Sequence, residues 1–261
     1  MIQPPKIYPA YIFDLDGTVY LGDKLLPGAG GTILALRERG ARIVFLSNNP
    51  TCTRSEYAAK LTRLGLPTVV EDVVHSTYVL IRFLGQEMPG ARLFVMGEQA
   101  LLGELAVAGF RLTREAGETD AVIAAFDRTF DYAKLQIAFD AVRAGARFFA
   151  TNADRFCPVP GGGEPDAAAV IAAVEACTGV QVEAVVGKPS RWMAVAALEA
   201  AGVPAAECLM VGDRLETDVR MGVEAGMATA LVLTGATRRE ELEGAEIRPD
   251  FVIDGLGDLI P

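Results

Sequence analysis

Residues 11–18 of the chain read YIFDLDGT, an apolar, strand-like run that leads directly into two carboxylates and a glycine. Further short apolar runs, at 42–46 and 209–211, alternate with longer segments of helical period at 31–39 and 55–64. Strands that alternate with helices in this way are typical of a parallel sheet covered by helices. The sequence therefore predicts an α/β fold with a Rossmann-like, parallel-sheet core.

The alternation resumes near the end of the chain, where 229–233 reads as another buried strand, after helical segments at 191–201 and 216–225. The middle of the chain has strand and helix patterns of its own, at 92–96, 99–108, 121–125, 132–144, 147–151 and 166–177. We interpret the middle as a second α/β domain inserted into the first. The turn at Pro89 and the polar stretch after Gly179 are the best boundaries, so residues 1–88 and 182–261 would form the core domain and 89–181 the inserted domain.

The bulk composition narrows the classes of partner. The chain has 261 residues, about half of them apolar, a formal net charge of −10 and a pI near 4.7. An acidic protein is repelled by nucleic acids and by anionic membranes, so we expect neither as a partner. The four cysteines form no C-x-x-C pair, and no signal-type or membrane-spanning apolar stretch occurs, which favours a reduced, cytoplasmic setting. The oligomeric state is left open, with a homodimer as one option.

Asp14 and Asp16 follow the first strand with one residue between them. Ligands bind at the carboxyl ends of strands in an open parallel sheet, so both carboxylates are expected at the active-site edge. Gly17 indicates that the strand ends there and that Asp16 can turn away from Asp14. Asp14 could then attack a phosphorus atom while Asp16 protonates the leaving oxygen and later activates water. An acidic turn after a strand is the ordinary alternative.

Three other segments supply what this chemistry needs. Ser47 and Asn48 follow the strand at 42–46, where a hydroxyl and backbone N–H groups can bind a phosphoryl oxygen. Lys188, in VGKPS, can neutralise both Asp14 and a phosphate. Asp213 and Asp218, in VGDRLETD, offer the hard oxygen ligands that suit Mg²⁺. A serine cap, a solvated lysine and an acidic helix start would explain each segment singly, but their joint occurrence at strand ends favours catalysis.

These motifs, in this order, resemble those of the haloacid dehalogenase superfamily: an aspartate pair, a Ser or Thr, a Lys and an acidic metal motif. The resemblance covers nearly the whole chain and is greatest to the branch of NagD-like and 4-nitrophenyl phosphatases. It is carried by the segments TVYLGDKLLPGA, FLSNN, ATNAD, VVGKPS and GDRLETDV.

The resemblance implies a role for each matching residue. Asp14 would be the nucleophile and a metal ligand, and Asp16 would be the acid and base and would bind the metal through its backbone carbonyl. Ser47, Asn48 and Lys188 would bind the phosphate. Asp213 would bind Mg²⁺ directly, with Asp218 as an indirect or water-mediated partner. Dehalogenases of this superfamily lack the carboxylate found here at position 16, so a phosphatase that forms an aspartyl-phosphate is favoured.

The resemblance also implies that the inserted domain is a cap that chooses the substrate. Here the cap departs from the commonest pattern: AAFDR keeps an aspartate, Asp127, but has Ala125 in place of a glycine, and DRFCPVPGGGEPD replaces a loop that usually ends P-G-x-G. Several stretches look most like the sugar phosphatase of arabinose operons, so we expect a small sugar phosphate or a similar phosphomonoester, with broad tolerance. The predicted substrate residues are Asp127, Asn152, Asp154 and Arg155, for which ordinary turn and helix-capping roles are an equal alternative.

Two alternatives remain open at this stage. A phosphotransferase would use the same nucleophile but would deliver the phosphoryl group to a sugar or nucleoside hydroxyl. A catalytically silent ligand-binding protein could share the fold, since a fold does not fix a function.

Overall fold

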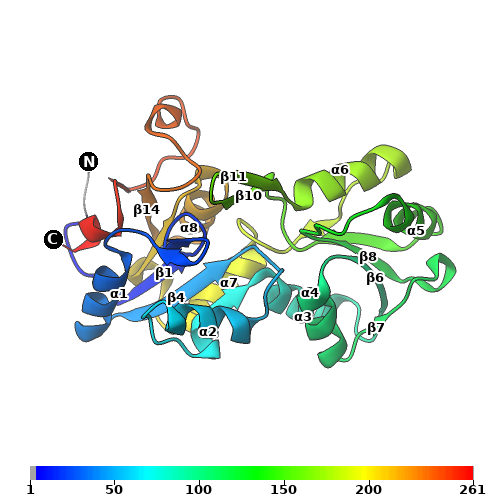
Figure 1. Cartoon of the computed structure of the whole chain (residues 1–261), viewed down its shortest axis with the longest axis horizontal. Coiled ribbons are helices and arrows are strands. Elements are labelled where there is room, and N and C mark those ends of the chain that lie inside the picture. The colour runs from blue at the N-terminus through cyan, green and yellow to red at the C-terminus, as the bar shows by residue number, and fades with distance from the viewer. Residues whose placement is uncertain (1–3, 261) are drawn as a thin grey trace.

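A computed structural model of the chain, which describes residues 4–260, contains two parallel sheets that lie side by side (Figure 1). The first has the strand order β15-β14-β13-β1-β4-β5. Its members are β1 (Ala10–Asp14), β4 (Arg42–Ser47), β5 (Val73–His75), β13 (Cys208–Gly212), β14 (Ala228–Val232) and β15 (Phe251–Ile253). Every neighbouring pair in this sheet is parallel, as the alternating pattern predicts.

Helices cover both faces of the first sheet because its strands are apolar on both sides. Along β1, Tyr11 and Phe13 pack on one face with α1 (Ala29–Glu38) and α2 (Arg54–Arg63). Ile12 points to the other face, which is covered by α3 (Ser76–Glu87), α7 (Arg191–Ala201) and α8 (Arg220–Glu224). A short hairpin of β2 (Tyr20–Leu21) and β3 (Lys24–Leu25) follows β1, and a π-helical turn, η4 (Leu215–Val219), precedes α8. The helix expected at 216–225 therefore begins as this wider turn.

The second sheet has the order β12-β9-β8-β6-β7 and is also parallel. Its strands are β6 (Arg92–Met96), β7 (Arg111–Leu112), β8 (Ala121–Ala124), β9 (Arg147–Ala150) and β12 (Ala184–Val185). One face packs on α5 (Tyr132–Arg143) and α6 (Ala167–Thr178), and the other packs on α4 (Gln99–Val107). An antiparallel hairpin of β10 (Phe156–Val159) and β11 (Gly162–Pro165) reaches from this sheet toward the first (Figure 1).

The chain leaves the first sheet once and returns to it once, so the second sheet is an insertion between β5 and β13. Strand β12 pairs with β9, so Ala184 and Val185 belong to the second sheet although both lie after residue 182. We therefore propose that the return to the core domain lies a few residues later than the sequence indicates, after Val185. No helix within residues 4–260 is long and apolar enough to cross a membrane.

Candidate active site

The carboxyl ends of three neighbouring strands bring the predicted core residues together. Asp14 is the last residue of β1 and is in register with Leu46 of β4, so Ser47, which ends β4, lies beside it. On the other side of β1, strand β13 ends at Gly212, and Asp213 follows directly. Ligands of open parallel sheets bind at this edge. The fold therefore places these side chains where an active site is expected.

Lys188 joins two of the aspartates. Its Nζ atom lies 2.5 Å from Asp14 Oδ1 and 2.6 Å from Asp218 Oδ1, and all three side chains are buried. Burial alone would lower the pKa of Lys188, but the two carboxylates outweigh burial and raise this pKa above its ordinary value. Burial also raises the pKa of Asp218, against the attraction of Lys188. One buried cation is therefore shared between two buried carboxylates.

Asp213 adds a third carboxylate to this cluster. One oxygen from each of Asp14, Asp213 and Asp218 lies within 4.8 Å of the others. The pKa of Asp213 is raised well above its ordinary value by burial and by the charges of Asp14 and Asp218. Three buried carboxylates with one lysine leave excess negative charge, which is unfavourable unless another cation binds. Hard carboxylate oxygens in this number fit a divalent cation.

Two glycines allow the carboxylates to pack this closely. A Cβ atom at Gly212 would lie 2.3 Å from Cγ of Asp218, and a Cβ atom at Gly235 would lie 1.9 Å from Oδ2 of Asp213. Real atoms do not approach so closely, so any side chain at either position would displace an aspartate. The backbone N–H of Ala236 donates to the same Asp213 oxygen at 2.6 Å, which fixes the carboxylate.

Asp16 lies in the same cavity but outside the carboxylate cluster. This cavity, of about 40 Å³, is lined by Asp14, Asp16 and Ser47 among others. Gly17, at φ 91°, donates its N–H to the carbonyl of Tyr20 and turns the chain away from the strand direction. Burial and the charge of Asp14 raise the pKa of Asp16 to about 7. A carboxyl group with a pKa near neutrality can both give and take a proton.

Ser47 and Asn48 are neighbours at the end of β4, and their side chains make different contacts. The Ser47 hydroxyl accepts from the Asn49 N–H at 3.1 Å and lies 3.3 Å from the Tyr57 hydroxyl. The Asn48 amide oxygen accepts from the backbone N–H of Lys188 at 2.7 Å, and its nitrogen donates to Asp154 at 2.8 Å. Asn48 therefore fixes the chain at Lys188 and reaches across to the second domain.

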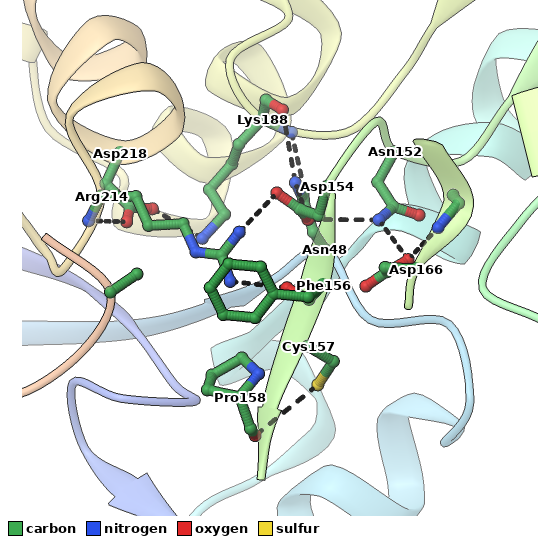
Figure 2. Close-up of polar contacts among 12 residues, drawn as sticks. Asn48, Asn152, Asp154, Phe156, Cys157, Pro158, Asp166, Lys188, Arg214 and Asp218 are labelled. Carbon is green, nitrogen blue, oxygen red and sulfur yellow. Dashed lines mark hydrogen bonds and ion pairs between the residues drawn. The ribbon is translucent and has the colours of Figure 1, made fainter. Parts of the chain in front are cut away.

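The four predicted cap residues lie in different places. Asp154 lines the cavity. The side-chain nitrogen of Asn152 donates to the carboxylate of Asp154 at 3.1 Å and to that of Asp166 at 3.0 Å (Figure 2). Arg155 lines a larger cavity next to the first one. Asp127 does not line either cavity: its carboxylate lies 2.6 Å from Lys134 Nζ within the second domain.

Several other side chains line the cavity, although sequence reasoning did not single them out. Phe156, Cys157 and Pro158, at the start of the β10–β11 hairpin, line one part of it, and the guanidinium of Arg214 lies beside Phe156 (Figure 2). Arg214 lies inside the motif VGDRLETD, so its charge next to Asp213 was an available signal. The three hairpin residues gave no such signal, because only the path of the hairpin brings them into the same cavity as Asp14.

Comparison with known proteins agrees with this geometry. A family model described as haloacid dehalogenase-like hydrolase matches residues 11–111, and a second, HAD-hydrolase-like, matches residues 185–259. Sugar-phosphatase AraL of Bacillus subtilis is 41% identical over 248 residues, which are 95% of this chain and 90% of AraL.

Two solved structures share the fold over nearly all of this chain. The crystal structure of a 4-nitrophenylphosphatase from Thermotoga maritima has a TM-score of 0.90 and 37% identity, over 97% of this chain and 96% of that one. A glycerol phosphate phosphatase from Mycobacterium tuberculosis, in complex with magnesium, has a TM-score of 0.88 and 33% identity, over 97% and 76% of the two chains. The chain belongs to the haloacid dehalogenase-like hydrolase family, within the branch that contains NagD and the 4-nitrophenylphosphatases.

Proposed function

We propose that this hydrolase is a Mg²⁺-dependent phosphatase of small phosphomonoesters that uses Asp14 as its nucleophile. The observation that carries the proposal is the position of Asp14 at a strand end, where Lys188 neutralises one oxygen and Asp16 lies in the same cavity with a pKa of about 7. A nucleophilic carboxylate must be ionised, and its partner in proton transfer must be able to hold a proton near neutral pH. This pair of aspartates meets both requirements.

In the first step, an Asp14 oxygen attacks phosphorus, the bond from phosphorus to the leaving oxygen breaks, and Asp16 gives that oxygen its proton. Lys188 and the Ser47 hydroxyl bind the phosphoryl oxygens while their charge is redistributed. In the second step, Asp16 takes a proton from a water molecule, whose oxygen attacks phosphorus and releases phosphate from Asp14. The sequence of two displacements is ping-pong in character.

The metal would be held mainly by Asp14 and Asp213. Within residues 4–260, each of these carboxylates has one oxygen without a hydrogen-bond partner, whereas Asp218 gives one oxygen to Lys188 and the other to the Arg214 N–H at 3.1 Å. We therefore assign Asp218 an indirect role and keep the backbone carbonyl of Asp16 as a further ligand. Mg²⁺ would offset the repulsion between the anionic nucleophile and the anionic substrate.

A sugar phosphate is our proposed substrate, since the similar proteins bear the names sugar phosphatase and glycerol phosphate phosphatase. Of the predicted cap residues, Asp154 and Arg155 line cavities that a substrate could enter, so they are the first positions to test. Asn152 would act by orienting Asp154, and the ion pair of Asp127 with Lys134 supports a structural role for that residue. The free cysteines support the cytoplasm as the setting.

The proposal is tested by measuring phosphate release from sugar phosphates, glycerol phosphate, nucleoside monophosphates and 4-nitrophenyl phosphate, with Mg²⁺ and with EDTA. We expect release only with the metal, and none from Asp14→Asn. The matched control is Asp140→Asn, the same chemical change at an exposed position on α5, which should leave the rate unchanged. A parent enzyme that binds these esters without turnover would favour the silent binding protein instead.

A further inference from the structure

Two cavities meet at the proposed active site, and they differ greatly in size. The inner one, over Asp14, has a volume of about 40 Å³, which leaves room for only a few water molecules. The outer one, of about 620 Å³, extends over Arg155 and the segment 236–247. Phe156 and Arg214 line both cavities, so these two side chains form part of the partition between them.

Arg214 holds this partition in place from the core domain. Its Nη2 atom donates to the carbonyl oxygen of Phe156 at 2.7 Å, and its Nη1 atom lies 3.4 Å from Asp154 Oδ1. The guanidinium carbon also lies 4.9 Å from the centre of the Phe156 ring, within the range of cation–π attraction. Figure 2 shows the guanidinium between these two residues. This core side chain thus contacts the segment of the second domain that begins the hairpin at two residues, Asp154 and Phe156.

Asp154 is held from a second direction as well. Its other oxygen accepts from the Asn48 amide at 2.8 Å, and Asn48 follows β4, whereas Arg214 follows β13. The same segment is therefore bound to two strand ends of the first sheet, on either side of Asp14. The ion pair of Arg214 with Asp154 is largely shielded from solvent, whereas its hydrogen bond to the Phe156 carbonyl lies at the surface.

The size of the inner cavity limits what can reach the phosphoryl group. With a phosphoryl group in it, the inner cavity leaves little further room, so a sugar or another alcohol would have to reach phosphorus past the partition, from the outer cavity. We propose that Arg214 is a positioning residue that holds the β10–β11 hairpin against the core domain. In this position the hairpin lets water reach the aspartyl-phosphate but keeps an alcohol out. The inference rests on the proposed phosphatase function, and it names the feature that separates hydrolysis from transfer.

Both outcomes of the second step balance chemically. In hydrolysis, the water oxygen bonds to phosphorus, the bond from phosphorus to Asp14 breaks, and the water proton goes to Asp16. In transfer, the oxygen of an alcohol replaces that of water and gives its proton to the same carboxylate, and the product is a new phosphate ester. The two reactions differ in the nucleophile, so the access of water or of an alcohol to phosphorus affects how the intermediate divides between them.

The experiment uses 4-nitrophenyl phosphate with glycerol as the added acceptor. Each turnover releases one nitrophenol, but transfer to glycerol releases no inorganic phosphate, so the ratio of nitrophenol to phosphate reports the partition. We expect a ratio near one for the parent at every glycerol concentration, and a ratio that rises with glycerol for Arg214→Ala. Arg220→Ala is the matched control, because Arg220 lines only the outer cavity and should keep the parent ratio.

A second measurement does not depend on turnover. Amide hydrogen exchange across residues 156–165 should be faster in Arg214→Ala than in the parent or in Arg220→Ala. Arg214→Lys keeps the charge but not the planar fork that reaches both partners, so its ratio and its exchange should be intermediate. Parent-like ratio and exchange in a folded Arg214→Ala would overturn the inference, as would a fully parent-like Arg214→Lys. If the parent itself releases no phosphate, the proposed function fails. Unchanged amide exchange in Arg214→Ala would separately reject the inference that Arg214 holds the hairpin.

Discussion

Lys188 Nζ lies 2.5 Å from Asp14 Oδ1, and both side chains are buried. Removal of the lysine leaves a buried carboxylate without its counter-charge, which typically costs about 3–5 kcal/mol. We therefore expect Lys188→Met to lose nearly all activity and to lower the free energy of unfolding by about that amount near neutral pH. Urea denaturation without metal measures this loss. In the double variant with Asp14→Asn the loss should be smaller, and equal losses would contradict a charge origin.

Metal binding should stabilise the fold as well as support activity. A cation that binds only the folded state at 100 times its dissociation constant adds about 2.7 kcal/mol. We expect Mg²⁺ to raise the thermal midpoint of the parent and to do so far less in Asp213→Asn, since Asp213 is one of the two main ligands that we propose. Ca²⁺ should also bind but should inhibit, because its looser coordination does not suit in-line attack. Full turnover in EDTA would contradict this expectation.

Asp16 should show its two roles in different half-reactions. In Asp16→Asn, cleavage of a sugar phosphate should slow greatly because the poor leaving group receives no proton. 4-Nitrophenyl phosphate needs no such proton, so phosphorylated enzyme should accumulate after a burst of nitrophenol roughly equal to the enzyme concentration. Rapid-mixing absorbance measures the burst. Equal loss with both esters and no burst would mean that Asp16 only builds the metal site.

The raised pKa of Asp16, about 7, also predicts a pH dependence. In the proposed mechanism the protonated carboxyl group of Asp16 is the donor in the first step, so the rate with a sugar phosphate should fall as the pH rises through about 7. The first step with 4-nitrophenyl phosphate should lack this fall, because its leaving group is stable as an anion. Single-turnover rates at a series of pH values compare the two esters directly, and identical profiles would remove Asp16 as the donor.

Asp166, which also lines the inner cavity, provides a prediction about stability. Burial raises its pKa from 3.8 to about 6, so the folded state holds this proton more tightly than the unfolded state. Stability from this group is therefore complete below about pH 4 and is lost as the pH rises through about 6, by ~3 kcal/mol at most. Asp166→Asn keeps the oxygen that accepts from Ala167 and Asn152, and should stabilise the protein at pH 8 but not at pH 4. Denaturation at the two pH values tests the difference.

The sequence predicted the α/β class and the family, and both are confirmed. The core motifs were predictable because each follows an apolar strand, and parallel strands must end at one edge of the sheet. That rule is general enough to place Asp14, Ser47 and Asp213 together without any knowledge of side-chain contacts.

The cap was less predictable because its contacts depend on long-range packing. Asp127 and Asp154 look alike in sequence, as polar residues soon after a cap strand, yet one pairs with Lys134 inside its own domain and the other reaches Asn48 and Arg214. The limit of the inserted domain was also hard to place, because β12 is only two residues long.

Phe83, on α3, contacts the ring of Phe149 in the second sheet at 5.2 Å and the ring of Trp192 on α7 at 5.0 Å. These rings belong to one apolar cluster that runs from the first sheet into the second without a polar break. Any rotation of the inserted domain must therefore either break this contact between aromatic rings or pivot about it, and it would separate Asp154 from Arg214 of the core domain. If this domain were exchanged for that of a relative, the contact of Phe83 with Phe149 and Trp192 would have to be matched as well. Rings that did not pack together would leave apolar surface exposed on both domains.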